Sequence, residues 1–155
     1  MEQLNFEIEL NKIYEKIGKA KFAVLATSSQ NKPTARTMSI VFIDNKIYCQ
    51  TSTEYVKYKQ ICENNNVALC IENIQIEGVA NIKGKTIEQN KFIEIFKENH
   101  NGSYKKYSGL EESRLIEIIP KKIVVWEYNS NGTPSRMFLE LETKKSYREM
   151  EKYIE

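Results

Sequence analysis

Residues 34–51 read TARTMSIVFIDNKIYCQT, and this stretch decides the fold. Residues 34–43 are long, apolar and rich in β-branched side chains, which predicts a strand. Asp44-Asn45 is typical of a hairpin turn, and residues 46–51 predict the returning strand. Because hairpins join antiparallel strands, this segment indicates an antiparallel barrel or sheet.

Strand-length apolar runs flank the hairpin on both sides, and turn residues separate them. Further strands are expected at residues 22–27, 67–72, 74–83, 115–128 with a bend at Pro120, and 137–142. About seven strands joined mostly by tight turns predict a mainly β, antiparallel fold. Neither a Gly-x-Gly-x-x-Gly fingerprint nor a P-loop occurs, which argues against a Rossmann fold.

Helices are expected outside this sheet, where apolar periodicity or capping residues indicate them. In chain order they cover residues 4–17, residues 54–64 behind a Thr53 cap, a segment opened by a Thr86–Gln89 capping box, and a C-terminal segment opened by a Ser146–Glu149 capping box. Residues 101–109 are expected to form a loop.

Length and charge limit the class of protein. A chain of 155 residues is expected to form one domain, residues 1–155. Its 23 Lys and Arg and 21 Asp and Glu are interspersed, which argues against a nucleic-acid partner. No signal peptide or bilayer-length apolar stretch occurs, so we expect a cytoplasmic protein with no membrane partner. The cysteines Cys49, Cys62 and Cys70 lack metal-ligand spacing, which predicts reduced thiols and no metal site.

Two cations stand out against this background. Arg36 lies in an otherwise apolar strand between hydroxyl side chains, where its desolvation is costly unless an anion meets it. Lys57 follows the hydroxyl run 51–53 by about one helical turn, near an expected helix N-terminus. Adjacent strands lie about 5 Å apart, so both cations can converge on one phosphate. The alternative is a solvent-facing arginine and an ordinary helix cap beside a solvated lysine.

These residues resemble the pyridoxamine 5′-phosphate oxidase-like family, the FMN-binding split-barrel proteins. That family has an arginine-led strand, a strand ending in threonine, a lysine six residues after that threonine, and then a Gln-Ile…Asn…Val stretch. The matching positions are residues 36–41, Gln50-Thr51, Lys57, Gln60-Ile61 and residues 64–67. The resemblance runs from about residue 22 to residue 142 and implies an antiparallel split β-barrel.

The resemblance also implies a cofactor and its contacts. In the family, the arginine and lysine that match Arg36 and Lys57 hold the phosphate of FMN. Flavin contacts carry over to Thr37, Met38, Ser39, Gln50, Thr51 and Ser52. Trp126 and Arg136, ten residues apart, match a pair that reaches the flavin from the partner subunit, which implies a homodimer with flavin sites at the interface. For Trp126 the alternative is a core aromatic.

The chain departs from the oxidase itself at the positions that bind its substrate. Val41, Gly132 and Pro134 stand where the oxidase has basic residues or a histidine, and Val56 replaces a second phosphate-binding arginine. We therefore expect an FMN-dependent oxidoreductase or flavin reductase that acts on a small molecule other than pyridoxamine phosphate. NADH and NADPH are candidate reductants. A non-catalytic flavin-storage or flavin-sensing protein is the alternative.

Three other residues invite a functional interpretation. His100 is the only histidine and is expected near a helix end, where a structural role is favoured over catalysis or a haem site. Tyr104 and Tyr107 are candidates to line a pocket, although surface packing explains them equally well.

Overall fold

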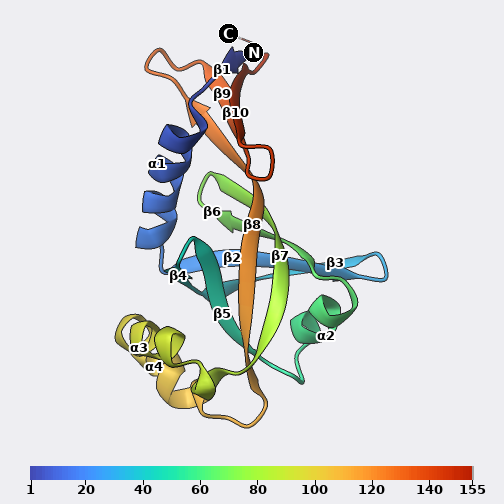
Figure 1. The fold of residues 1–155 in the computed structure, drawn as a ribbon. Helices are drawn as coiled ribbons and strands as arrows, with labels where there is room; N and C mark the ends of the chain where they lie inside the picture. Colours follow the sequence, from blue (N-terminus) through green and yellow to red (C-terminus); the bar gives the residue numbers. More distant parts are fainter. Residues whose placement is uncertain (155) are drawn as a thin grey trace.

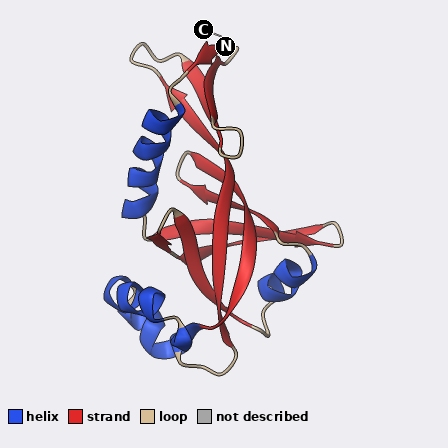
Figure 2. Ribbon diagram, viewed as in Figure 1, coloured by secondary structure: helices blue, strands red, loops and turns tan. Residues whose placement is uncertain are grey.

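The computed structural model describes residues 1–154, and within them an antiparallel ten-stranded sheet coils into a split barrel (Figures 1 and 2). The strands are β1 (Glu2–Gln3), β2 (Phe22–Ser29), β3 (Lys32–Ser39), β4 (Val41–Ile43), β5 (Lys46–Ser52), β6 (Asn66–Ile71), β7 (Ile74–Lys85), β8 (Ser113–Tyr128), β9 (Pro134–Glu140) and β10 (Lys145–Met150). The helices are α1 (Phe6–Lys19), α2 (Val56–Glu63), α3 (Asn90–Asn99) and α4 (Asn101–Ser103), with short helical turns η1 (Thr86–Glu88) and η2 (Tyr104–Ser108).

The long strand β8 organises the sheet. Residues 113–118 of β8 pair with β5, and residues 122–128 pair with β9, while β7 runs along the other side. The expected irregularity at Pro120 coincides with a register shift, where Pro120 faces Gly78. A Cβ atom on Gly78 would lie 2.7 Å from the Ile119 carbonyl oxygen, so the backbones approach too closely for any other residue.

The expected strand over residues 34–43 is divided in two. β3 pairs with β2, whereas β4 pairs with β5, and Ile40 between them donates its N–H to the Lys21 carbonyl at 3.0 Å. The chain therefore changes its pairing partner from β2 to β5 at Ile40. As expected, Asp44 and Asn45 form the turn, and both adopt the left-handed conformation that tight hairpins require.

The main core fills the barrel. It is built from inward side chains of the strands and from Ile13 and Ile17 of α1, all at most 9% exposed. A smaller cluster under α3 joins Phe92 and Phe96 to Val41, Ile43 and Leu115. No helix within residues 1–154 is long and apolar enough to cross a membrane.

Several expected helix boundaries were wrong. α2 begins at Val56, and the Glu54 N–H bonds to Ser52 rather than Thr53. The Thr86 hydroxyl bonds to Ser113 at 2.8 Å, so it caps nothing, and α3 starts only at Asn90. Residues 101–108 are helical rather than a loop.

The expected C-terminal helix was also wrong. Residues 145–150 form β10, which pairs with β9 and covers what would otherwise be an exposed sheet edge. Lys144 turns the chain in the left-handed conformation, and Ser146 is buried with its hydroxyl directed at the Met137 sulfur. The preceding strand accordingly lies at Pro134–Glu140 and not at residues 137–142.

Candidate cofactor site

Arg36 lies on β3, the last strand of the sheet, and is held by hydroxyl groups. Its Nη1 donates to Thr27 Oγ1 at 2.8 Å and to the Leu25 carbonyl at 3.3 Å, and its Nη2 donates to Thr34 Oγ1. These acceptors are neutral. Burial lowers the pKa of Arg36, which means that the surroundings disfavour its charge.

Gln60 on α2 organises this arrangement. Its Oε1 accepts hydrogen bonds from Thr27 at 2.5 Å and from Thr34 at 2.7 Å, and its Nε2 donates to the Lys32 carbonyl at 2.9 Å. Because each threonine gives its proton to Gln60, its lone pairs are left to accept from Arg36. From the sequence alone, no role was expected for Thr27, Thr34 or Gln60, although Gln60 belongs to the matching Gln-Ile motif.

Lys57 on α2 is the second cation. Its Nζ donates to Thr51 Oγ1 at 3.3 Å and lies 4.8 Å from the centre of the Tyr55 ring. Burial, and then repulsion from Arg36, lower the pKa of Lys57, so the two charges are close enough to oppose each other.

No carboxylate among residues 1–154 balances this pair. Within residues 1–154, neither Arg36 nor Lys57 takes part in any ion pair. Cys49 lies near both, but burial raises the pKa of its thiol to about 12, so it stays neutral at physiological pH. Within the described part of the chain, the site is therefore two partly buried positive charges without a negative one, which favours the binding of an anion.

The other residues that were expected to contact the flavin differ in their exposure to solvent. Thr37 is exposed and Ser39 is half-buried, whereas the Met38 side chain lies in the core, 8% exposed. A ligand would therefore meet Met38 through its backbone. On β5, Gln50 accepts a hydrogen bond from Ser108 at 2.7 Å.

Trp126 and Arg136 are directly opposed on β8 and β9, but they lie far from Arg36. The part of β8 that pairs with β9 lies at the upper end of the molecule in Figure 1, whereas β3 crosses its middle. Trp126 is 41% exposed, so it is not a core aromatic. Arg136 pairs with Glu149 at 3.7 Å and with Glu151. One chain therefore does not bring this pair to the Arg36–Lys57 site.

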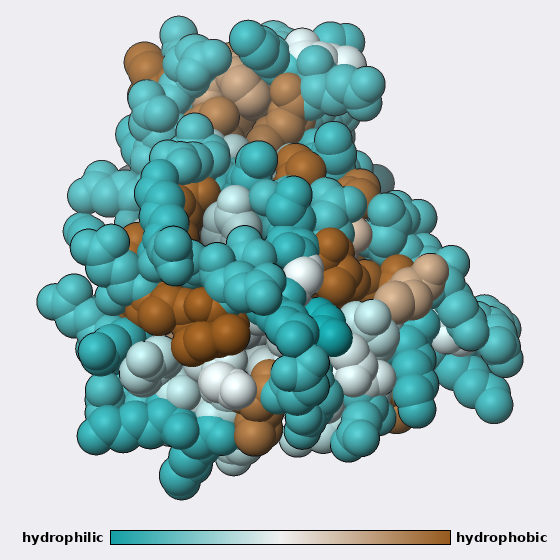
Figure 3. Space-filling model, turned by 60° about the horizontal axis from the view of Figure 1, so that its bottom comes forward, coloured by the Kyte–Doolittle hydropathy of each residue, from teal (hydrophilic) through white to brown (hydrophobic). Residues whose placement is uncertain are grey.

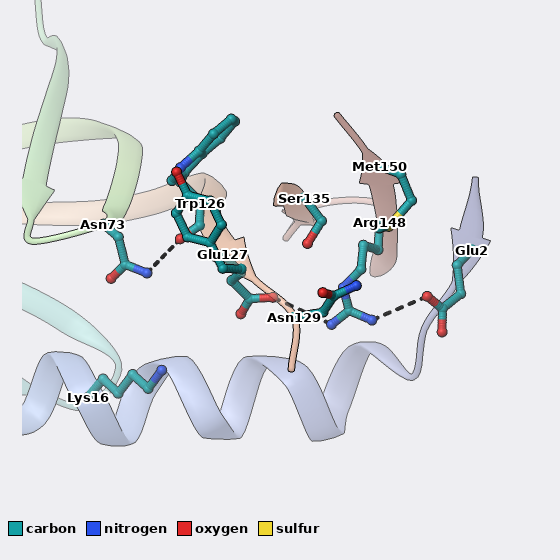
Figure 4. Close-up of a pocket in the computed structure, with 10 residues that line it drawn as sticks. Glu2, Lys16, Asn73, Trp126, Glu127, Asn129, Ser135, Arg148 and Met150 are labelled. Atoms are coloured by element: carbon teal, nitrogen blue, oxygen red, sulfur yellow. Dashed lines mark hydrogen bonds and ion pairs between the residues drawn. The ribbon is translucent and has the colours of Figure 1, made fainter. Parts of the chain in front are cut away.

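A cavity of about 790 Å³ lies beside Trp126. Unlike the site of Arg36 and Lys57, it pairs its arginine with carboxylates. Figure 4 shows the Trp126 ring pointing away from α1, while Arg148 lies between Glu2 and Glu127. Arg148 pairs with these carboxylates at 3.2 and 3.5 Å. Its charge is satisfied within the chain, unlike those of Arg36 and Lys57.

His100 has a structural role. It is 8% exposed, its Nε2 lies 3.0 Å from the Ile40 carbonyl oxygen, and its ring packs against Phe22 and Phe96. It therefore braces the point where β3 gives way to β4 and does not face a ligand. Within residues 1–154, no group of three or more His, Cys, Asp or Glu side chains is placed to hold a metal ion.

The fold defines an antiparallel split β-barrel protein, and its β3 and α2 carry two cations that have no ion-pair partner among residues 1–154. A family model described as pyridoxamine 5′-phosphate oxidase matches residues 10–127. The chain belongs to this family. No sequence among curated proteins matches it.

Solved structures share the fold. General Stress Protein 26 from Bacillus anthracis is 25% identical, with a TM-score of 0.63, over 86% of this chain and 99% of its own. A pyridoxamine 5′-phosphate oxidase-related, FMN-binding protein from Nostoc punctiforme is 14% identical, with a TM-score of 0.62, over 95% of each chain. HutZ, the heme storage protein from Vibrio cholerae, is 16% identical, with a TM-score of 0.61, over 79% of this chain and 95% of its own.

Proposed function

We propose that this protein is an FMN-dependent oxidoreductase that binds the phosphate of FMN between Arg36 and Lys57. The observation that carries the proposal is the pair of partly buried, mutually repelling cations with no carboxylate partner among residues 1–154. A phosphate of charge about −2 would balance both. Membership of the family and the FMN-binding relative support FMN as the phosphorylated ligand.

Each residue then has a defined task. Arg36 offers a planar fork to the phosphate, held in place by the Thr27–Thr34–Gln60 network. Lys57 adds a point charge from α2. Backbone groups on the free edge of β3 and the side chains of Thr37 and Ser39 orient the flavin, with Gln50, Thr51 and Ser52 on the β5 side. FMN, when bound, supplies the redox chemistry, so no side chain of the chain must act as a nucleophile.

The proposal includes a homodimer. Trp126 lines a different cavity, in which neither Arg36 nor Lys57 takes part, but a symmetric partner can bring its copies of Trp126 and Arg136 to the flavin. The outer face of β8–β10 presents Trp126 and Tyr128, 41% and 67% exposed, to such a partner. Arg136 would have to leave Glu149 and Glu151, or be shared with them, in order to meet a ligand.

The substrate is proposed to be a small molecule other than pyridoxamine phosphate. Val41, Gly132 and Pro134 give no charge at positions where the oxidase holds its substrate phosphate. In the fold, Val41 is buried at 3% exposure and belongs to the α3 cluster, so it cannot contact a substrate through its side chain.

The visible absorption spectrum of the purified protein tests the proposal. A flavin spectrum that bleaches on addition of NADH or NADPH is expected. A flavin spectrum that persists with both reductants would favour a non-catalytic flavin-storage or flavin-sensing protein instead. Failure to bind added FMN would contradict both functions.

A further inference from the structure

The buried hydroxyl group of Ser108 has no role in the proposed function so far. Ser108 is the last residue of η2 and is 0% exposed, and its Oγ donates a hydrogen bond to Gln50 Oε1 at 2.7 Å. η2 is a π-helical turn, a rare conformation that is frequent at functional sites. A hydroxyl group removed from water is costly unless it is hydrogen-bonded, so the bond to Gln50 fixes both side chains.

Gln50 lies where the proposed flavin site and the phosphate site meet. It lines a cavity of about 370 Å³ together with Thr51 and Ser52, the β5 residues that we assign to the flavin. The Lys57 Nζ donates to Thr51 Oγ1 at 3.3 Å, so the cavity adjoins the proposed phosphate site. It lies at the lower end of the molecule in Figure 1, and Figure 3 shows this end as a mostly polar surface broken by smaller apolar areas.

The bond from Ser108 determines which end of the Gln50 carboxamide is free. Oε1 accepts the hydroxyl proton, whereas Nε2 makes no hydrogen bond to any group among residues 1–154. No buried side-chain nitrogen or oxygen in this part of the chain lacks a partner, so Nε2 is open to solvent or to a ligand. Rotation of the carboxamide would leave the buried hydroxyl proton of Ser108 without its acceptor. Gln50 therefore offers N–H donors, and not its carbonyl oxygen, on the side away from Ser108.

We propose that Ser108 is a positioning residue, which holds the Gln50 carboxamide so that its N–H donates to a carbonyl oxygen of the flavin ring and favours the reduced flavin. Uptake of two electrons and one proton leaves the ring with a negative charge that its carbonyl oxygens share. A hydrogen bond to a charged acceptor is about twice as strong as one to a neutral acceptor, so a fixed donor there stabilises the reduced form more than the oxidised form. This inference rests on the proposed FMN function.

The midpoint potential of the bound flavin tests the inference, measured together with the Kd of oxidised FMN. Ser108→Ala frees the carboxamide and should reduce the preference for reduced over oxidised FMN about tenfold, which makes the potential of a two-electron couple about 30 mV more negative. The Kd of oxidised FMN should stay within about threefold. Ser108→Thr, which keeps the hydroxyl group, should retain the wild-type potential, and Ser103→Ala on the neighbouring helix α4 is the control for loss of a serine hydroxyl group.

A second pair of variants separates positioning from a general effect on the fold. Gln50→Met removes the N–H donors and should shift the potential as Ser108→Ala does. Addition of Ser108→Ala to Gln50→Met should then cause no further shift, because Ser108 acts only through Gln50. A further shift in the double variant would overturn the inference.

The other outcomes distinguish this inference from the proposed function. Normal FMN binding with an unchanged potential in Ser108→Ala would overturn the positioning role and leave the FMN function standing. A more positive potential would also overturn it, because the carbonyl oxygen of Gln50 would then face the ring. A wild-type protein that binds no flavin would overturn the proposed function and this inference with it.

Discussion

Replacing Arg36 by alanine removes the fork that we assign to the phosphate. In the structure its Nη atoms bind only neutral oxygens, from Thr27, Thr34 and Leu25, so no carboxylate is left unpaired when the charge is removed. A hydrogen bond to a charged group contributes about 1.5–3 kcal/mol. The loss of one such interaction raises the Kd of FMN about 10-fold to 150-fold, at 1.4 kcal/mol per decade.

Riboflavin provides the decisive comparison, because it carries the same ring without the phosphate. Quenching of flavin fluorescence gives the Kd of both ligands for the wild type and for Arg36→Ala. We expect Arg36→Ala to raise the Kd of FMN and to change the Kd of riboflavin by no more than about twofold, since only FMN carries the phosphate. Lys59→Ala is the matched control: it removes an exposed charge from α2 two residues from Lys57, and it should change neither Kd.

Two results would refute this reasoning. An FMN affinity that is unchanged in Arg36→Ala would mean that the phosphate binds elsewhere. Equal weakening of FMN and riboflavin would mean that Arg36 acts through the fold of β2 and β3 and not on the phosphate.

Three further predictions concern charge, assembly and packing. Because burial and Arg36 lower the pKa of Lys57, the unfolded chain keeps that proton to higher pH than the folded chain. The free energy of unfolding of the ligand-free protein should therefore rise as the pH increases toward about 10.4, and Lys57→Met should remove this rise in denaturant titrations while weakening FMN binding. Trp126→Ala should reduce dimerisation and FMN binding together in sedimentation experiments with flavin stoichiometry, and a wild-type monomer that binds one FMN tightly would contradict the shared site. Gly78→Ala should lower the melting temperature by about 2–4 °C for each kcal/mol of overpacking, whereas Gly102→Ala, whose Cβ meets no atom within 4 Å, should change it little; equal melting temperatures would show that the backbone can yield at Gly78.

The barrel was predictable from sequence because its signals are local. Alternating or continuous apolar runs and the Asp44-Asn45 turn specify strands and hairpins within a few residues. A helix was expected in the C-terminal segment because the Ser146–Glu149 pattern is equally compatible with a helix cap. Only pairing with β9, which no local pattern reveals, makes residues 145–150 a strand.

In the candidate site, too, local sequence signals were readable, whereas contacts between distant segments were not. Arg36 and Lys57 were recognisable from their unusual surroundings in sequence. Gln60 and Thr27 were not, because their role depends on α2 packing across β2 and β3, a contact between distant parts of the chain. Similarly, the ion pairs that hold Arg136 come from β10 and the residue after it, where a helix was expected.

The central claim is that one phosphate lies between Arg36 and Lys57, and a crystal structure of the protein with FMN tests it most directly. We predict that phosphate oxygens lie about 2.7–3.2 Å from both the Arg36 guanidinium and the Lys57 Nζ. A bound FMN whose phosphate contacts neither residue, with Arg36 still held by Thr27 and Thr34 alone, would contradict the claim.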